Sequence, residues 1–419
     1  MTQRPRKVLH VLNSAGGGAA LSTLGLMEQF RQMGVTSCAV CHDSGSPHER
    51  QCLHEATDGE VRFTPLYWWN KKIRSPLWKR PLSELKQSLA TGWTRRSARE
   101  VVEQARQCGA DLIHTNTLLT PEGGMAAAQL QLPHVWHVRE LIGAGNPFPL
   151  RLSGPALGKY LVGHCSKLIA NSEVCASYVR DLVPSGWLEV VPNGIDITRF
   201  VPREVDGSRD RIVVAMVGNL TSRLKKHRLF VEAAARTDPS LPIQWRIYGH
   251  DPSDGGSRAV DSYVNQLHAR IAAVGLAHRF AWPGFVSDPA KIMSEIDILV
   301  HPVDNESFGR TVVEAMAAGL PTVGVAGGGV AEIIEDGVTG LIAATDDSVA
   351  LAGCIERLAR DGALRQTMGA AGRRRAEANY SLEACAAGVM RVYEAAMEHP
   401  VTSQSVGPTL PDVVTTGNA

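Results

Sequence analysis

Two glutamates, Glu306 and Glu314, stand eight positions apart in the stretch HPVDNESFGRTVVEAMAAGLP, residues 301–321. If both lay on one helix, eight residues would turn it by about 800° and advance it by roughly 12 Å, so the two carboxylates could not reach one atom. The residues before Glu306, IDILVHPV, are typical of a short buried strand. We therefore expect Glu306 in a loop, followed by a helix from about residues 307–310 to Gly319, which places Glu314 in the second turn of that helix.

The first turn of this expected helix is suited to binding an anion. Its amides would lack intrahelical partners and would lie at the positive end of the helix dipole, where a phosphate fits. These amides belong to Phe308, Gly309, Arg310 and Thr311. A carboxylate would repel that phosphate, but it is a good acceptor for hydroxyl groups on either side of it. A diphosphate with a ribose on one flank and a hexose on the other has this arrangement, and the alternative is a solvated surface helix in which both glutamates are incidental.

Length and composition limit the class of protein. A chain of 419 residues with 44% hydrophobic content is expected to form two or three globular domains. The formal net charge of +1 and the pI of about 7.7 provide no basic field that would favour nucleic acid. No apolar run reaches the roughly 18–20 residues that span a bilayer, and the N-terminal stretch passes directly into a strand pattern.

The eight cysteines are scattered through the chain, which suits a reducing compartment. The C-x-x-C pair Cys38 and Cys41 falls at the end of an expected strand, without a second pair for zinc. We therefore expect buried thiols there and not redox chemistry. The expected location is the cytoplasm, with peripheral binding at the inner face of the membrane as the alternative.

Strand and helix patterns alternate in two runs along the chain. The first run begins with KVLHVLNS, a buried strand, and AALSTLGLMEQFRQM, an amphipathic helix, and the second run begins with RIVVAMVGN. We therefore expect an α/β protein with two doubly wound domains, whose ligands bind at the carboxyl ends of the strands. The expected parts are an N-terminal domain over 1–195, a linker over 196–210, a C-terminal domain over 211–380, a helix over 381–398 and a disordered tail over 399–419.

Two glycine clusters fall at such strand ends. Residues 16–18 follow the first strand of the N-terminal half, and residues 327–329 follow the strand after the Glu314 helix. Gly17 and Gly18 are expected to let a ligand approach the backbone, and the alternative for either cluster is a tight turn. Neither half supplies the G-x-G-x-x-G pattern with a later acidic residue that a Rossmann NAD site needs.

The stretch ESFGRTVVEAMAAGLP resembles, almost letter by letter, the E-x7-E motif of the retaining family-four glycosyltransferases with the GT-B fold, the glycosyl transferases group 1. DLIHTNT, LIANSEVCASYVR, VVPNGIDITRF and GGGVAEIIEDGVTGLI are similar to other parts of that family, and the resemblance covers about residues 7–398. It implies two Rossmann-like domains facing a central cleft, with the acceptor side in the N-terminal domain over 1–195, the nucleotide-sugar site in the C-terminal domain over 211–380, and the helix over 381–398 packed back on the N-terminal domain. It further implies transfer of a sugar from a nucleotide diphosphate donor to a hydroxyl acceptor with retention of configuration. It also implies that Glu314 binds the nucleotide ribose and Glu306 the transferred sugar.

One position departs from the family pattern. The family usually has an arginine directly after the glycine of the strand that opens the second domain and a lysine a few residues on, both binding the diphosphate. In VGNLTSRLKKH the glycine is Gly218, and Asn219 stands where the arginine is expected. Lys225 corresponds best to the family lysine, Lys226 is the neighbouring alternative, and Arg223 could replace the missing charge. A cation is needed because the leaving nucleoside diphosphate develops charge in the transition state.

His137, in HVWHVRE, resembles the histidine at the acceptor-side catalytic position of the family, and Arg139 and Glu140 beside it are expected acceptor or sugar contacts. The alternative for His137 is a histidine satisfied inside the core. A double displacement would need a carboxylate nucleophile under the anomeric carbon, and the sequence offers no evident one. The resemblance implies instead a front-face reaction in which the departing phosphate takes the acceptor proton.

The sequence contains no D-x-D pair that could hold a divalent ion on the diphosphate. We therefore expect no metal and no cofactor, with the positive helix terminus, Lys225 and Arg223 meeting the diphosphate charge. Other functions that share parts of the pattern are a sugar-nucleotide epimerase, a phosphorylase with pyridoxal phosphate on a lysine, and a non-catalytic sugar-nucleotide binding protein.

Residues 67–81, YWWNKKIRSPLWKRP, interleave aromatic and cationic side chains without an acid. This composition favours contact with an anionic membrane surface or a lipid-linked acceptor. The alternative is an ordinary loop with packed aromatic side chains.

Overall fold

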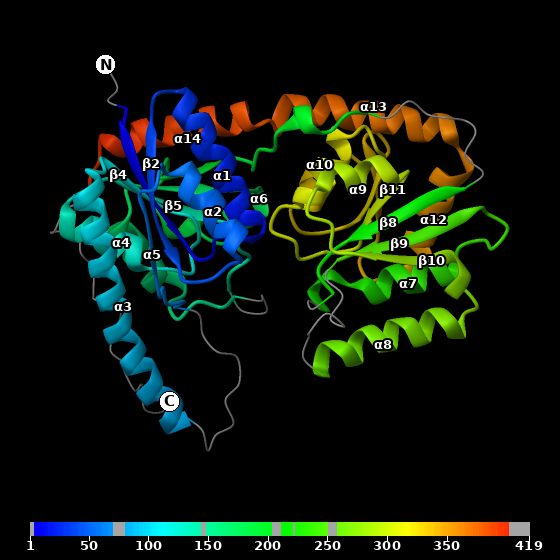
Figure 1. Cartoon of the computed structure of the whole chain (residues 1–419), viewed down its shortest axis with the longest axis horizontal. Coiled ribbons are helices and arrows are strands. Elements are labelled where there is room, and N and C mark those ends of the chain that lie inside the picture. The colour runs from blue at the N-terminus through cyan, green and yellow to red at the C-terminus, as the bar shows by residue number, and fades with distance from the viewer. Residues whose placement is uncertain are drawn as a thin grey trace. The chain divides into compact units, whose positions relative to one another are not determined.

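The structure is a computed structural model that describes residues 4–69, 80–143, 148–202, 211–220, 223–249 and 258–401. In the helix Arg80–Cys108 (α3) it describes side chains from residue 92 onward, and in the helix Arg258–Ala273 (α8) from residue 263 onward. Residues 70–79 of the basic and aromatic segment, 203–210 of the expected linker and 402–419 of the expected tail lie outside the described residues. The chain divides into two compact units, the first made of residues 1–194 and 382–419 and the second of Ile195–Ser381. Each unit contains one sheet with helices against it (Figure 1).

The first unit contains a seven-stranded sheet in the order β3-β2-β1-β4-β5-β6-β7, and all its strand pairs are parallel. Its strands are β1 (Lys7–Leu12), β2 (Thr36–His42), β3 (Val61–Thr64), β4 (Leu112–Thr115), β5 (His134–Val138), β6 (Lys167–Ala170) and β7 (Leu188–Val190). Its other helices are α1 (Gly17–Gln32), α2 (Pro47–Ala56), α4 (Glu122–Leu130), α5 (Gly154–His164), α6 (Glu173–Ser177), the 3-10 turn Arg180–Leu182 and α14 (Leu382–Met397). The strand order reverses between β1 and β4, which is where doubly wound sheets bind ligands.

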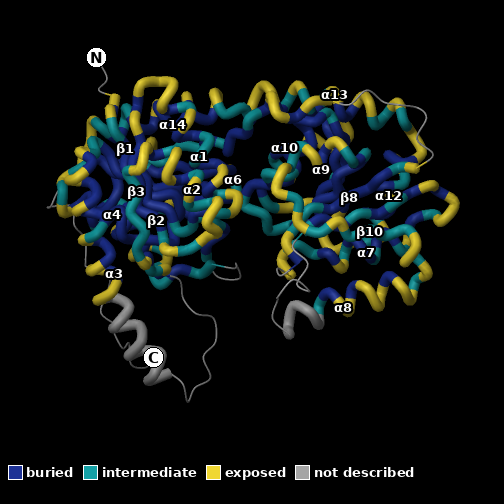
Figure 2. The backbone as a smooth tube through the Cα atoms, in the orientation of Figure 1, coloured by how far each residue is buried: buried dark blue, intermediate teal, exposed yellow. Residues whose placement is uncertain are grey.

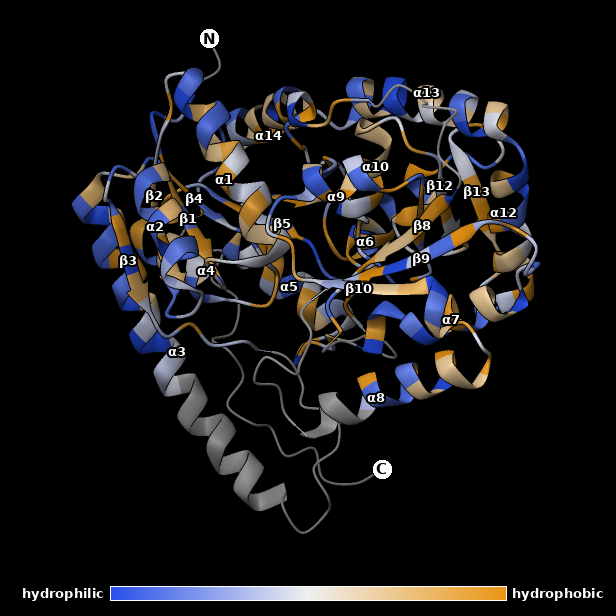
Figure 3. Cartoon of the chain, turned by 45° about the vertical axis from the view of Figure 1, so that its right-hand side comes forward, coloured by the Kyte–Doolittle hydropathy of each residue, from blue (hydrophilic) through white to orange (hydrophobic). Residues whose placement is uncertain are grey.

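Helices cover both faces of this first sheet. Because successive strand residues point to opposite faces, Val8 packs with residues of α1 and α14, whereas Leu9 packs with residues of α3 and α4. The helix expected over 381–398 thus belongs to the first unit as α14, where Tyr393 is fully buried against α1 residue Phe30. Strands β1, β2, β4, β5 and β6 are largely buried and hydrophobic, whereas β3 and β7 are only half-buried (Figures 2 and 3).

The second unit contains a six-stranded parallel sheet in the order β10-β9-β8-β11-β12-β13, and its order reverses between β8 and β11. Its strands are β8 (Ile212–Val217), β9 (Ile243–Tyr248), β10 (Phe280–Gly284), β11 (Ile298–His301), β12 (Thr322–Val325) and β13 (Gly340–Ala343). Its helices are α7 (His227–Arg236), α8, α9 (Pro289–Glu295), α10 (Arg310–Ala317), α11 (Val330–Ile333), α12 (Ser348–Arg360), α13 (Gly362–Asn379) and the 3-10 turns η3 (Ile197–Arg199), η4 (Arg223–Lys225) and η6 (Ala277–Arg279). One core joins the sheet to α7, α8 and α12, and the other joins it to α9, α10 and α13.

The predicted α/β architecture with two doubly wound sheets is confirmed, as is the helix expected between Glu306 and Gly319, which is α10. α10 begins at Arg310 and ends before Gly319, whose φ of 71° suits a helix stop. Two residues of the stretch predicted as a linker, Ile197 and Phe200, are buried in the core of the second unit.

The prediction of buried thiols at the C-x-x-C pair is wrong for one of its cysteines. Cys41 is a buried thiol, and burial raises its pKa to about 12. Cys38 forms a disulfide with Cys108, the last residue of α3, 70 positions later in the chain. The fold brings β2 and α3 together, and local spacing could not reveal that contact.

Candidate functional site

Glu306 lies in the loop that joins β11 to α10, after the carboxyl end of the strand. Gly309 ends this loop with a φ of 108°, and a Cβ there would lie 2.8 Å from Val330 Cγ2, so both the backbone and the available space require glycine. From the other side, the Gly329 amide donates to the Glu306 carbonyl at 2.8 Å, and a Cβ on Gly328 would lie 2.6 Å from the same oxygen. The second glycine cluster therefore packs against the loop and positions it.

The Glu306 carboxylate lies between a lysine and a histidine. Its Oε2 is 2.5 Å from Lys225 Nζ and 3.3 Å from His301 Nε2. Burial by itself would raise the pKa of Glu306, but the hydrogen bond from His301 and the charge of Lys225 lower that pKa to about 2, so the group is ionised at neutral pH. His301 is oriented in turn by Thr311, whose Oγ1 lies 3.2 Å from His301 Nδ1. The sequence prediction missed His301, because a histidine at the end of an apolar strand has the pattern of a core residue.

Lys225 reaches Glu306 from the neighbouring strand. It is the last residue of η4, which follows β8, and β8 pairs with β11 where the strand order reverses. A Cβ on Gly218 would lie 3.2 Å from Lys225 Cβ and Cγ, so this glycine leaves room for the stem of the lysine. The fold therefore brings the predicted Lys225, Gly218 and Glu306 together at the position where such sheets bind ligands.

Lys226, the alternative to Lys225, has a different environment. Its Nζ lies 2.8 Å from Asp304 Oδ1 and 2.7 Å from Asp346 Oδ1, so it links two loops of the second unit. A cation already held by two carboxylates is less available to a phosphate than one that faces a single carboxylate. The geometry favours Lys225 over Lys226 as the cation of the site.

Arg223 and Asn219 are both exposed near the end of β8. The Arg223 guanidinium carbon lies 5.3 Å from the centre of the Tyr263 ring, in the range of a cation–π contact. The structure thus places Arg223 against an aromatic side chain, and its role as a counter-charge stays a prediction.

Glu314 is buried on α10, with 3% of its surface exposed. Its Oε1 accepts from Arg310 Nε at 2.9 Å. Burial raises the pKa of Glu314, and the charges of Arg310 and Arg199 act in the opposite direction. Phe308 is also buried, with its ring edge-on to Tyr380 at 5.9 Å between centroids. It precedes Gly309, the N-cap of α10, so it lies just outside the first turn in which the sequence predicts it.

Gly17 and Gly18 begin α1 in the first unit. Gly17 has a φ of 86°, and a Cβ built on either residue meets no atom within 4 Å. Packing therefore does not require glycine at these two positions, and the space above both backbones is open, as expected where a ligand approaches the chain.

His137 is fully buried in β5, also in the first unit. Its Nδ1 lies 3.3 Å from His114 Nε2, and its Nε2 has no hydrogen-bond partner among the described residues. Burial, with the charge of Arg139 and the neighbouring His114, holds the pKa of His137 well below its usual value. The ring is therefore neutral, and its Nε2 is a buried nitrogen without a partner among the described residues.

Arg139 and Glu140, which follow β5, both have hydrogen-bond partners within the first unit. Arg139 Nη1 donates to Asn193 Oδ1. Glu140 accepts from the Thr117 hydroxyl and, at 3.2 Å, from the Leu118 amide, and burial raises its pKa. These bonds fix Glu140 to the loop after β4, so its predicted role as an acceptor contact gains no support from the geometry.

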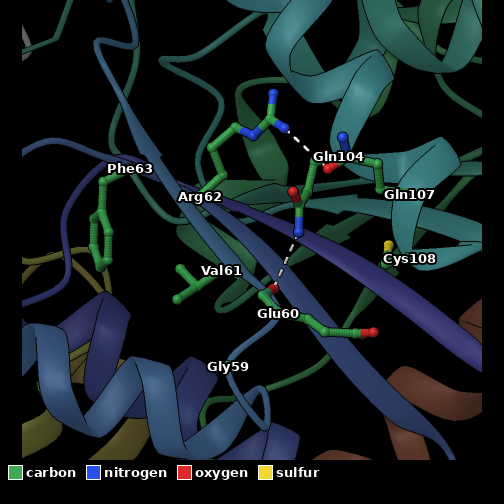
Figure 4. Close-up of a pocket in the computed structure, with 8 residues that line it drawn as sticks. All are labelled: Gly59, Glu60, Val61, Arg62, Phe63, Gln104, Gln107 and Cys108. Carbon is green, nitrogen blue, oxygen red and sulfur yellow. Dashed lines mark hydrogen bonds between the residues drawn. The ribbon is translucent and has the colours of Figure 1, made fainter.

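A groove of about 560 Å³ lies between β3 and the end of α3 (Figure 4). Three of its polar side chains already have partners within the groove: Arg62 Nη2 donates to Gln107 Oε1 at 3.0 Å, and Gln104 Nε2 donates to the backbone carbonyl of Glu60 at 3.3 Å. None of the residues predicted for the site lines this groove.

Within the described ranges, no group of three or more His, Cys, Asp and Glu side chains is placed to hold a metal ion. Of the helices that the structure describes, none combines the length and the apolar character needed to cross a membrane.

Comparison with known proteins identifies the family. The model of glycosyl transferases group 1 matches residues 200–375, and that of glycosyltransferase family 4 matches residues 16–199. A D-inositol 3-phosphate glycosyltransferase of Salinispora arenicola is 28% identical over 320 residues, covering 70% of this chain and 70% of the relative. A protein of the same name from an Arthrobacter species is 27% identical over 386 residues, covering 86% of this chain and 84% of the relative.

Solved structures share the fold. Anabaena HepE, crystallised with UDP and glucose, superposes with a TM-score of 0.71 at 22% identity, over 92% of this chain and 98% of its own. The sucrose-phosphate synthase of Thermosynechococcus elongatus superposes with a TM-score of 0.66 at 22% identity, over 93% of this chain and 98% of its own. These likenesses agree with the two parallel sheets and show the fold. The two family models, which match residues 16–199 and 200–375, show that the chain belongs to the glycosyl transferases group 1, the GT-B enzymes that transfer a sugar from a nucleotide sugar to an acceptor.

Proposed function

We propose that this glycosyltransferase moves a hexose from a UDP-sugar to a hydroxyl acceptor with retention of configuration and without a bound metal ion. The observation that carries the proposal is the position of Lys225 Nζ, which lies 2.5 Å from the carboxylate of Glu306, a residue of the loop that leads to the first turn of α10. A cation and a helix N-terminus together provide the positive field that a leaving diphosphate requires.

Each part of the donor then has a partner in the second unit. The amides of the first turn of α10 and Lys225 receive the diphosphate. Glu314, one turn further along the helix, accepts from the ribose hydroxyls. Glu306 accepts from the hydroxyls of the hexose, and its lowered pKa keeps it an acceptor at every pH near neutrality.

The comparisons suggest which donor and acceptor to assay first. HepE has been crystallised with UDP and with UDP-glucose, which supports a UDP-sugar as the donor. The curated relatives are named for D-inositol 3-phosphate, so a phosphorylated polyol is the first acceptor class to test. Hydroxyl groups of a lipid-linked acceptor are the second class, because the first unit also exposes two tryptophans, Trp68 and Trp93.

The protein should turn over a UDP-hexose, and excess EDTA should leave the rate unchanged, because side chains and amides supply the positive charge. The measurement is UDP release from a panel of UDP-hexoses, with and without D-inositol 3-phosphate, before and after chelation, with the product anomer assigned by NMR. An absolute requirement for magnesium or manganese would contradict the metal-free account, and an inverted anomer would contradict retention. Release of an isomerised UDP-sugar would identify an epimerase, and binding without UDP release would identify a binding protein.

We also propose peripheral contact with an anionic membrane through an aromatic and basic patch on the first unit. Trp68 is 42% exposed and Trp93 is 49% exposed, although large hydrophobic side chains are usually buried. Trp93 stacks with Tyr67 at 5.7 Å between ring centroids, and the neighbouring Arg95 and Arg96 on α3 are exposed. Tryptophan with arginine is the combination that suits the headgroup region of an anionic bilayer.

The Trp68→Ala, Trp93→Ala double variant should lose vesicle binding. Without the two half-exposed indoles, the binding free energy to the membrane should be weaker by about 2 kcal/mol, because less apolar surface is buried in the bilayer. This corresponds to a decrease of about thirty-fold in the membrane–water partition coefficient. The measurement is co-sedimentation with vesicles of phosphatidylglycerol and phosphatidylcholine, with Phe285→Ala, an exposed aromatic of the second unit, as the matched control. Equal binding by the double variant and the wild type, or no binding by the wild type, would remove the membrane proposal.

A further inference from the structure

We propose that His137 presents its Nε2–H to a ligand as a fixed hydrogen-bond donor, and that Tyr393 and His114 act as positioning residues that set this tautomer. The proposal rests on the proposed function only in taking the ligand to be a substrate of sugar transfer. The three side chains come from β5, β4 and α14, so residues up to 279 positions apart form one chain of hydrogen bonds inside the first unit.

The geometry of this chain is continuous. The Tyr393 hydroxyl lies 2.6 Å from His114 Nδ1, and His114 Nε2 lies 3.3 Å from His137 Nδ1. The two imidazole planes differ by only 11°, so an N–H of one ring can point at the lone pair of the other. Both nitrogens of His114 are thereby used, and His137 Nε2 is the end of the chain without a partner among the described residues.

All three groups keep their protons in the neutral form. Burial holds the pKa of His114 and of His137 well below the usual value, and the charge of Arg139 acts in the same direction. Burial also keeps the pKa of Tyr393 well above its usual value, so its hydroxyl retains its proton. Each imidazole therefore carries one N–H and one lone pair.

The direction of the hydrogen bonds follows from the tyrosine. Tyr393 is fully buried, and His114 is the one hydrogen-bond partner of its hydroxyl in the part of the chain that the structure describes. If His114 Nδ1 carried the proton, the Tyr393 proton would be buried without an acceptor, which costs about 1–3 kcal/mol. Tyr393 therefore donates to His114 Nδ1, His114 Nε2 donates to His137 Nδ1, and the proton of His137 sits on Nε2.

This assignment decides what His137 can do. A ring with its lone pair on Nε2 would accept a proton from a substrate hydroxyl as a base, whereas a ring with N–H there donates to a substrate oxygen. The structure favours the second role. No proton leaves His137 during the reaction, so the acceptor proton must be taken by another group, in agreement with a departing phosphate as the base.

The direct test is the histidine side-chain ¹⁵N spectrum of the full-length protein, with His114 and His137 assigned by substitution. We expect both rings as the Nε2–H tautomer in the wild type, and a change of tautomer population at both rings in Tyr393→Phe. An Nδ1–H tautomer at His137 in the wild type would overturn the proposal by itself, even where the Tyr393→Phe variant does not fold. This spectrum needs no turnover, so it fails or succeeds independently of the proposed function.

Kinetics separate positioning from a merely structural role. Tyr393→Phe should lower kcat for UDP release by about two- to ten-fold, the range for loss of one buried neutral hydrogen bond. His137→Gln places an amide N–H near the position of Nε2 and has no tautomers, so Tyr393→Phe should have little further effect in that background. The matched control is Tyr160→Phe, which removes a buried hydroxyl of the same unit that has no partner among the described residues. An equal loss from Tyr393→Phe in both backgrounds would show that Tyr393 supports only the fold.

Discussion

Replacing Lys225 with alanine should lower kcat for UDP release by about 100-fold, the usual effect of removing one preorganised donor from a developing negative charge. Lys225 Nζ lies 2.5 Å from Glu306 Oε2, which holds the ammonium at the position where the diphosphate is expected. Its contact strengthens as the glycosidic bond breaks, because charge accumulates on the leaving group. The variant should therefore lose more in kcat than in affinity for UDP.

Two neighbouring cations provide the controls for Lys225. Lys226→Ala removes a lysine held by Asp304 and Asp346, and Arg223→Ala removes an exposed guanidinium that lies over Tyr263. Both should reduce kcat much less than Lys225→Ala. If Arg223→Ala costs as much, the missing arginine at Asn219 is replaced by Arg223, and if Lys225→Ala is fully active, the counter-charge comes from a group outside this loop.

Glu314→Ala should weaken UDP binding by about ten-fold or more, since a hydrogen bond to a charged acceptor contributes roughly 1.5–3 kcal/mol. The carboxylate is buried and one of its oxygens faces Arg310 Nε at 2.9 Å, so a ribose hydroxyl would join an acceptor that is already fixed in place. Glu306→Ala, by contrast, should leave UDP affinity nearly intact, because UDP lacks the sugar that Glu306 is proposed to bind, and should lower turnover of the UDP-sugar.

The measurement for Glu314 is calorimetric titration of UDP into each variant, with thermal unfolding to confirm the fold. Glu314→Gln keeps the volume and one acceptor oxygen and should fall between the wild type and Glu314→Ala. The matched control is Glu295→Gln, which breaks another Glu–Arg contact of the second unit, with Arg246 at 3.2 Å. Unchanged UDP affinity in Glu314→Ala would remove the ribose assignment.

The parts of the site that the sequence predicts are those encoded locally. A buried strand, a loop ending in Gly309 and a helix stopping at Gly319 are properties of short stretches, and the structure has them at the expected residues. The family pattern assigns Lys225 to the diphosphate and Glu306 to the sugar of one donor, and the structure brings the two side chains together because the loops after two adjacent parallel strands meet at one edge of a sheet.

The parts that the sequence analysis missed depend on contacts between distant segments. In the sequence, His301 has the pattern of a core residue at the end of β11. In the structure, its two ring nitrogens lie next to Thr311 and Glu306. Cys38 pairs with Cys108 and not within its C-x-x-C, because β2 and α3 meet only in the folded sheet. The partner of His114 is Tyr393, and no local pattern connects residues that far apart.

The most direct test of the account is a crystal structure of the protein with an intact UDP-sugar. We expect the diphosphate oxygens within about 3.2 Å of Lys225 Nζ and of amides in the first turn of α10. The ribose hydroxyls should donate hydrogen bonds to Glu314, and the hexose hydroxyls should donate to Glu306. A nucleotide bound elsewhere, with Lys225 still paired to Glu306 and the first turn of α10 empty, would contradict the account.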